Sequence, residues 1–339
     1  MMKKILGFVW ILIVLGFVWN GYVMANDATN LYKSRVLIDA QWGNDYDKFG
    51  LLIGKKGQEI EPIGPLTFTV NDKENIYIFD TVNRQVKKFS AEGVYEETIA
   101  FNVYGTSICV DKGENLYILN GHTIMQYSND GLLTNTYEIS KDIDLIEGYG
   151  QNVFCDMEGN LCVNKIQEIY IVVTSVETKQ KSNSKKLLSP SMQKETKKWG
   201  LPGNKLNDYF AVKWIDSHNM TIRALYDNKD LTLSRAPLKE ISTKTQDSFG
   251  GVLFLGQDNH DAIYIETERI TSDNYVHLEV KKYDLKGNML AEIELPNDYL
   301  TPIYKKIAID SQGNIYHLLT TPEGVIVVKW QQILEKEDK

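Results

Sequence analysis

The chain has 339 residues, 43% of them hydrophobic and 24% charged, with a mean hydropathy of −0.29. This composition is ordinary for a soluble protein, and the length suits one large repeat domain or two average domains. A net charge of −8 and a pI near 5.3 argue against nucleic acid as the main partner, because binding phosphates needs a concentrated basic surface.

The N-terminus is predicted to be a secretory signal. Lys3 and Lys4 precede an uninterrupted apolar stretch from Ile5 to Trp19, and the small residues needed for cleavage lie in Val23-Met24-Ala25. This pattern predicts a helical signal peptide over residues 1–25, cleaved after Ala25. An uncleaved membrane anchor is the alternative, although the apolar stretch is short for a span of about 20 residues. In both cases we expect the rest of the chain to be extracytoplasmic, either secreted or anchored to the outer side of the membrane.

One sequence cassette recurs along the chain: an apolar strand, a turn rich in Asp and Asn, and a second strand that contains Tyr in most copies. Asp, Asn and Gly favour positions where the chain reverses with positive φ. The second strand is apolar on both faces, as in Ile76–Phe79, which is typical of strands covered on both sides. The six copies are Phe68–Ile78, Ile108–Ile118, Phe154–Val163, Val212–Ile222, Phe254–Ile265 and Ala308–Tyr316.

A second pattern extends each cassette to four strands. An aromatic residue is followed four positions later by Gly, and a short strand comes next. The copies are Phe89 to Gly93, Tyr127 to Gly131, and Tyr283 to Gly287. Four strands per cassette is the unit of a β-propeller blade.

The two ends of the chain complete the architecture. The last cassette lacks a fourth strand, and Arg35–Gly43 is an unassigned strand near the N-terminus. Pairing the two would close a ring and remove an exposed edge. The sequence therefore predicts an all-β, six-bladed propeller of four-stranded antiparallel blades over residues 26–330, closed by the N-terminal strand and followed by a polar tail at 331–339.

These residues resemble a known family. Gly64-Pro65, followed by the segment from Ile76 through Asp80, Asn83 and Arg84 to Phe89, is similar to the NHL repeat of bacterial six-bladed propellers. The resemblance implies the fold and a tendency to bind ligands or partners. It implies no single activity, because members include binding modules, scaffolds and a minority of enzymes.

A Lys-rich segment at 177–198 interrupts the repeats. With few large apolar residues, it is predicted to be a solvated insertion loop. The alternative is a basic contact loop for an acidic partner, such as an anionic cell-wall polymer or lipid headgroups.

The candidate metal ligands have structural interpretations. No His-x₃-His, His-Glu-x-x-His or Cys-x-x-Cys motif is present, although ligands from different blades could converge on a central axis. His218 and His260 occupy similar turn positions, and His317 takes a strand position held elsewhere by Ile. The turn acids and the repeat signature are interpreted as turn formers. The residues concerned are His122, His218, His260, His277, His317, Asp111, Asp156, Asp216, Asp310, Asp80, Asn83 and Arg84.

Three cysteines are too few for a disulfide scaffold. Cys155 and Cys162 flank a short turn, so one disulfide between them is possible. The alternative is that both, with Cys109, are buried small apolar residues.

No catalytic residue, metal ligand or cofactor is predicted, and the binding residues stay unassigned. We expect a monomeric, non-catalytic binding or scaffold module that presents one propeller face to a protein, peptide or glycan. The alternative is a metal-dependent hydrolase or lyase with Ca²⁺ or Zn²⁺ at the mouth of the central channel. Peptide-amidating lyases and lactonases of similar fold suggest it, but neither ligand set can be placed on this chain.

Overall fold

The computed structural model describes residues 31–55, 60–141, 151–156, 159–165, 168–173, 197–204, 208–226 and 239–333. The predicted signal segment 1–25 and its cleavage site lie outside these residues, as does the Lys-rich segment except for its last two residues, 197 and 198. All described elements are β-strands, and no helix in this part of the chain is long and apolar enough to cross a membrane. The all-β prediction is confirmed.

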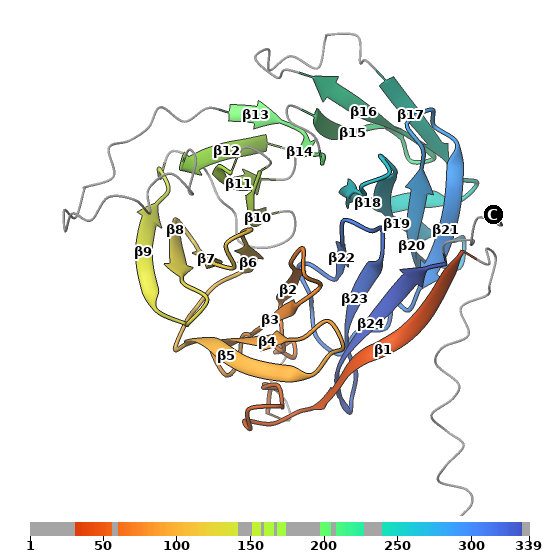
Figure 1. Ribbon diagram of the computed structural model, residues 1–339. Coiled ribbons are helices and arrows are strands. Elements are labelled where there is room, and N and C mark those ends of the chain that lie inside the picture. Colours follow the sequence, from red (N-terminus) through yellow and green to blue (C-terminus); the bar gives the residue numbers. More distant parts are fainter. Residues whose placement is uncertain are drawn as a thin grey trace, which may run out of the picture.

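The strands of the described chain form six four-stranded antiparallel sheets, which surround a common centre in Figure 1. At most boundaries the first strands of neighbouring sheets contact one another around that centre, an arrangement consistent with a β-propeller. Sheet 1 contains β2 (Thr67–Val70), β3 (Ile76–Asp80), β4 (Gln85–Phe89) and β5 (Tyr95–Phe101). Sheet 2 contains β6 (Ser107–Val110), β7 (Leu116–Asn120), β8 (Thr123–Tyr127) and β9 (Leu133–Glu138). Sheet 3 contains β10 (Gln151–Cys155), β11 (Leu161–Lys165), β12 (Glu168–Val173) and β13 (Lys197–Trp199). Sheets 4 to 6 contain β14 (Leu201–Pro202), β15 (Asp208–Asp216), β16 (Asn219–Tyr226) and β17 (Lys239–Lys244); β18 (Ser248–Gln257), β19 (Ile263–Ile270), β20 (Val276–Tyr283) and β21 (Met289–Leu295); and β22 (Ile307–Ile309), β23 (Ile315–Thr320), β24 (Gly324–Gln332) and β1 (Tyr32–Gln41).

Sheet 6 joins the two ends of the described chain. β1 pairs antiparallel with β24, from Tyr32 opposite Gln332 to Gln41 opposite Gly324. The strand predicted at Arg35–Gly43 therefore takes the outer position that the last cassette lacked. β24 runs two residues beyond the predicted end of the propeller at residue 330.

Because successive strands are antiparallel, the connections lie on two opposite rims. Rim A carries the turns between the first and second strands and between the third and fourth, such as residues 71–75 and 90–94. Rim B carries the turns between the second and third strands, such as 81–84, and the links between sheets, such as 102–106. The described chain enters β1 and leaves β24 on rim A.

The recurring cassette forms a specific turn on rim A. In sheet 2, Asp111 Oδ1 accepts the backbone N–H of Asn115 at 2.8 Å, Glu114 has φ +62°, and the Tyr117 hydroxyl donates to Asp111 Oδ2 at 2.9 Å. The carboxylate thus satisfies the turn and a buried hydroxyl that would otherwise be costly to bury. The arrangement recurs at Asp258 with Tyr264, at Asp310 with Tyr316, and at Asp156 with Cys162 in place of tyrosine. At Asn71 the turn is the same, but the side-chain amide donates to the Tyr77 hydroxyl.

The fourth predicted cassette was placed in the wrong hairpin. The Asp216–Asn219 turn joins β15 to β16, the second and third strands of sheet 4, and so lies on rim B. The first and second strands of that sheet, β14 and β15, instead pair with Leu201 opposite Phe210 and Pro202 opposite Tyr209. Asp216 still stabilises this turn, because its Oδ1 accepts a hydrogen bond from Asn219 Nδ2 at 2.8 Å. The same kind of turn thus occurs in a different hairpin.

The second strand of most sheets is covered on both faces. Every residue of β3 and β23 is buried, and the apolar side chains divide between clusters on either side. Ile78 packs toward sheet 6 and Tyr77 toward sheet 2. This accounts for the continuous apolarity of these strands.

Gly313 allows sheets 5 and 6 to approach closely on rim A. Its φ is +83°, and a Cβ would lie 2.2 Å from the Tyr264 hydroxyl. Gly159 holds the same turn position in sheet 3 with φ +76°, and no atom of the described chain lies within 4 Å of its Cβ position.

We expect Gly313→Ala to destabilise the protein more than Gly159→Ala. Both variants force alanine into the left-handed region, which costs about 1–2 kcal/mol. Gly313→Ala must also displace Tyr264, adding about 1–3 kcal/mol as in overpacked cores. Urea unfolding of the two variants measures the difference. Equal losses would show that the sheets do not approach as described.

Candidate functional site

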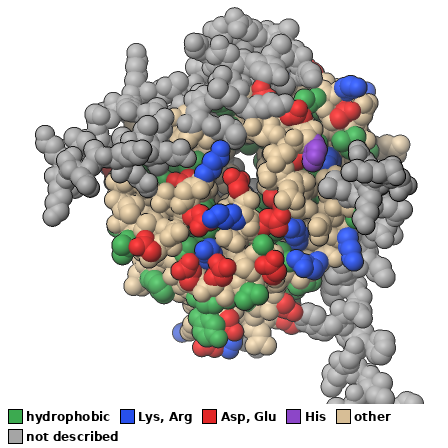
Figure 2. Space-filling view, in the orientation of Figure 1, with side chains coloured by type: hydrophobic (Ala, Val, Ile, Leu, Met, Phe, Trp, Pro, Cys, Tyr) green, Lys and Arg blue, Asp and Glu red, His purple; other side chains and the backbone are tan. Residues whose placement is uncertain are grey.

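Two ion pairs on rim A join neighbouring sheets. Lys329 of sheet 6 contacts Glu74 of sheet 1 at 2.6 Å, and Lys73 of sheet 1 contacts Glu114 of sheet 2 at 2.6 Å. In Figure 2, Asp and Glu side chains are interspersed with Lys and Arg around the middle of the ring. These charges join neighbouring sheets, and a ligand would have to compete with those contacts.

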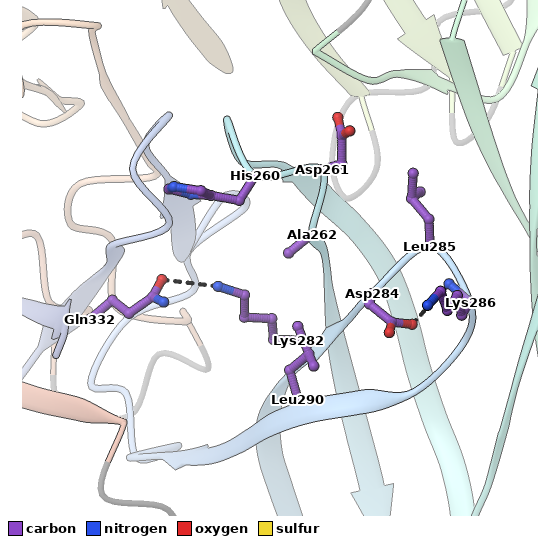
Figure 3. A pocket seen from close by; sticks show the side chains of 9 residues that line it. All are labelled: His260, Asp261, Ala262, Lys282, Asp284, Leu285, Lys286, Leu290 and Gln332. Atoms are coloured by element: carbon purple, nitrogen blue, oxygen red, sulfur yellow. Dashed lines mark hydrogen bonds between the residues drawn. The ribbon is translucent and has the colours of Figure 1, made fainter. Parts of the chain in front are cut away.

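A pocket of about 440 Å³ opens on rim A beside the end of β24 (Figure 3). It combines two leucines with basic, acidic and amide side chains from sheets 5 and 6. The lining residues are His260, Asp261, Ala262, Lys282, Asp284, Leu285, Lys286, Leu290 and Gln332.

Several polar side chains of this pocket make contacts that join sheets 5 and 6 or stabilise a turn. Lys282 Nζ lies 3.1 Å from Asp258 Oδ2 and donates to Gln332 Oε1 at 2.9 Å, so it joins sheet 5 to sheet 6 (Figure 3). Asp284 Oδ1 accepts the backbone N–H groups of Lys286 and Asn288, each at 2.8 Å. Lys282, Asp284 and Gln332 are therefore engaged in turn formation and sheet packing.

Exposed aromatic side chains gather on the opposite rim. Among the described residues, five aromatic side chains are between 44% and 67% exposed. Four of them, Phe101, Tyr104, Trp214 and Tyr275, lie on rim B. The fifth, Tyr46, lies in the link that leaves β1 from rim B, with its ring near Tyr95. The exposed apolar residues at the rim A turns, such as Leu132, are aliphatic.

The largest group on rim B surrounds sheet 1. The Arg84 guanidinium stacks over the Tyr104 ring, 4.5 Å from its centroid, and Phe101 ends β5 beside them. Leu52 and Ile53 are exposed in the link that crosses this sheet. We call these five residues (Leu52, Ile53, Arg84, Phe101 and Tyr104) the rim B patch.

A buried ion pair fixes the link beneath the patch. Lys87 Nζ lies 3.1 Å from Asp80 Oδ2, and both side chains are fully buried. Asp80 Oδ1 accepts the backbone N–H of Gly50 at 3.0 Å, and Asn83 Nδ2 donates to Gly43 O at 3.0 Å. Asp80 and Asn83 therefore hold the link 43–50 against the turn, in agreement with their predicted structural role.

Two residues of the patch region have unusual backbone conformations. Arg84 has φ +57° and Asn102 has φ +54°, and neither is glycine. Glu74, Glu114 and Asp261 share this left-handed conformation in the rim A turns, so it marks tight turns on both rims. Arg84 was interpreted as a turn former, and in the structure the residue is also exposed and stacks on Tyr104.

The structure separates several residues that sequence patterns had grouped. His218 is in a rim B turn and His260 in a rim A turn, so they do not occupy equivalent positions. His122 Nδ1 is 3.2 Å from Ser140 O, and His277 Nδ1 is 2.6 Å from Glu294. His317 is fully buried, as predicted. No group of three or more His, Cys, Asp or Glu side chains in the described part of the chain could hold a metal ion.

Of the two alternatives for Cys155 and Cys162, a disulfide or free thiols, the structure has the free thiols. Cys155 lies opposite Leu161, whereas Cys162 lies opposite Phe154, so the two side chains point to opposite faces of sheet 3. Cys162 instead donates its thiol to Asp156 Oδ2 at 3.8 Å. All three cysteines are free thiols.

No protein-family model and no curated protein matches the chain. Solved structures similar to it include virginiamycin B lyase from Staphylococcus aureus, with 11% identity, covering 89% of this chain and 100% of that one, at a TM-score of 0.43. Regucalcin, a calcium-binding protein from Agrobacterium tumefaciens, is 14% identical over 90% and 96% of the two chains, at a TM-score of 0.46. A gluconolactonase from Xanthomonas campestris is 11% identical over 80% and 88%, at 0.38.

These neighbours are propeller-type folds. Because identities are low and TM-scores lie below 0.5, no residue or activity is transferred from them to this chain. The fold rests on the sheet topology described above, and membership of the NHL family stays a prediction.

Proposed function

We propose that the protein is an exported, six-bladed propeller of the NHL type that binds a protein or peptide through rim B. It acts as a non-catalytic binding or scaffold module. The observation that carries this proposal is the placement of Phe101, Tyr104, Trp214 and Tyr275, which expose aromatic rings on rim B, whereas no aromatic side chain of the described residues is exposed at the rim A turns. Aromatic residues and arginine are enriched at protein interfaces and supply most of their hot spots.

The chemistry of the rim B patch defines the partner. Leu52, Ile53 and Phe101 expose apolar side chains on rim B, where the Arg84 guanidinium is stacked on Tyr104. A stacked guanidinium still presents its N–H groups in the plane of the fork, where it can bind a carboxylate. The patch therefore suits a segment in which an acidic residue stands beside large apolar residues.

Selection from a phage-displayed library of random short peptides tests this proposal. The tightest peptide recovered on the folded protein is measured by calorimetry against Tyr104→Ala and Leu132→Ala, which remove exposed side chains from opposite rims. We expect Tyr104→Ala to weaken binding about 30-fold, the effect of losing a hot spot of about 2 kcal/mol. Leu132→Ala is expected to leave the affinity within about twofold.

Two outcomes would contradict the proposal. Selected peptides whose affinity falls with Leu132→Ala and not with Tyr104→Ala would place the site on rim A. A glycan array probed in parallel would overturn the peptide assignment if only glycans bound and their binding required Tyr104. Circular dichroism and thermal unfolding of each variant exclude loss of fold as the cause.

The metal-dependent hydrolase or lyase remains the alternative function. It predicts that Ca²⁺ or Zn²⁺ raises the thermal midpoint, because an ion that binds only the native state stabilises it by mass action. An unchanged midpoint with both ions would argue against this alternative.

A further inference from the structure

Cys109 and Cys155 lie on neighbouring inner strands in matching positions. β6 and β10 are the first strands of sheets 2 and 3, and both run from rim B to rim A. The backbone N–H of Val153 in β10 donates to Ser107 Oγ in β6 at 3.2 Å. Two residues further along each strand are Cys109 and Cys155. Because side chains repeat every two residues along a strand, these cysteines face each other across the same boundary.

The packing agrees with this register. Cys109 and Cys155 belong to one apolar cluster between sheets 2 and 3, whereas Cys162 belongs to a different one between sheets 3 and 4. Cys155 is near enough to Cys109 to influence the pKa of its thiol. Burial raises the pKa of the Cys109 thiol well above its usual value, and Cys155 next to it raises that pKa further.

We propose that Cys109 and Cys155 form a disulfide that links sheets 2 and 3 when the folded protein meets a small disulfide oxidant. This bond is independent of the partner bound at rim B. It would tie together two sheets whose boundary, in the described chain, is otherwise an apolar cluster joined by the Ser107 hydroxyl.

The reaction balances as an exchange of one disulfide for another. The Cys155 thiolate, on the more exposed of the two residues, attacks one sulfur of oxidised glutathione, forms a mixed disulfide and releases one glutathione thiolate. Cys109 then loses its proton, and its thiolate attacks the Cys155 sulfur and releases the second glutathione. Two protein thiols are oxidised to one disulfide, and one glutathione disulfide is reduced to two thiols.

Oxidised glutathione added to the reduced, full-length protein tests the proposal. We expect an intact mass lower by two hydrogens than that of the reduced protein, and a non-reducing peptide map that joins the Cys109 and Cys155 peptides. The matched control Cys162→Ser should form the same link. Cys109→Ser should stop at the mixed disulfide on Cys155, which traps the first step.

The oxidised protein should also unfold at a higher temperature than the reduced protein, and this difference should vanish in Cys155→Ser. A map that joins Cys155 to Cys162 would overturn the proposal. So would a folded protein in which Cys109 and Cys155 remain free to alkylation after prolonged oxidation.

Discussion

Replacing Lys87 with methionine is expected to lower the free energy of unfolding by about 3–5 kcal/mol, the cost of breaking a buried ion pair from one side. The change leaves the fully buried Asp80 carboxylate without the ammonium 3.1 Å away. It also removes hydrogen bonds from Nζ to the backbone carbonyls of Asp45 and Lys48, and a cation–π contact with Phe49. Urea unfolding followed by circular dichroism measures the loss.

A double-mutant cycle separates the charge from the packing. Asp80→Asn keeps the side-chain shape and removes the negative charge, so Asp80→Asn combined with Lys87→Met leaves no unpaired charge. We expect the double variant to be at least about 1 kcal/mol more stable than the sum of the single losses predicts. Additive losses would show that the two charges do not interact in the folded protein.

Replacing His317 with isoleucine is expected to remove much of the acid sensitivity of the fold. Burial lowers the pKa of His317 to about 3, helped by the nearby Lys306 charge. The imidazole Nε2 is 2.7 Å from the Tyr299 hydroxyl, and Nδ1 has no hydrogen-bond partner among the described residues. The ring is therefore neutral when folded, while in the unfolded chain it takes up a proton below about 6.5.

The sign of the effect follows from that lowered pKa. The contribution of the neutral His317 ring to the free energy of unfolding is complete above pH 6.5. It is lost as the pH falls from 6.5 toward 3, by an amount of the order of 4 kcal/mol. Isoleucine occupies the matching strand position as Ile78, Ile118 and Ile265, so the variant should keep the packing. Denaturation from pH 8 to pH 3 should show a smaller acid loss in His317→Ile than in the unmodified protein.

Glu266 provides a control, because burial raises its pKa whereas burial lowers the pKa of His317. Burial raises its pKa to about 7, with Glu268 adding to the rise and Lys306 opposing it. A raised carboxyl pKa contributes stability that is complete below pH 4.5 and is lost as pH rises through 7. Glu266→Gln should therefore change how the free energy of unfolding varies with pH near neutrality, and leave its variation in acid unchanged. Identical pH profiles for the two variants would contradict both assignments.

The repeat and its turns were predictable because their chemistry is local. Asp111, Asn115 and Tyr117 lie within one hairpin, so their spacing alone indicates the turn. The fourth cassette was misplaced because the same local turn pattern can occur in either hairpin of a sheet. Asp216 and Asn219 make the same kind of turn between the second and third strands of sheet 4, and only the pairing with β14 reveals which hairpin it is.

The state of the cysteines could not be decided from the sequence for a related reason. Cys155 and Cys162 are near in sequence, but an antiparallel hairpin places them on opposite faces of the sheet. The neighbour of Cys155 comes from a strand in the adjacent sheet, and no pattern within one cassette identifies it.

The rim B patch could not be predicted from the sequence. Leu52, Arg84 and Tyr104 come from three separate connections, and each alone is an ordinary loop residue. They form a surface because β1 closes sheet 6, which sends the following link across the rim of sheet 1, where Gly50 binds Asp80. No sequence pattern indicates which loop residues share a surface. The site can therefore be recognised only once the strand order is known.

Hydrogen–deuterium exchange of the protein, with and without the tightest selected peptide, tests most directly whether rim B is the binding face. We predict slower exchange of backbone amides in residues 50–55, 81–84 and 101–106 when the peptide is bound, with no change in the rim A turns at 258–262 and 284–288. Protection confined to those rim A turns, around His260 and Lys286, would contradict the account and assign binding to the pocket instead.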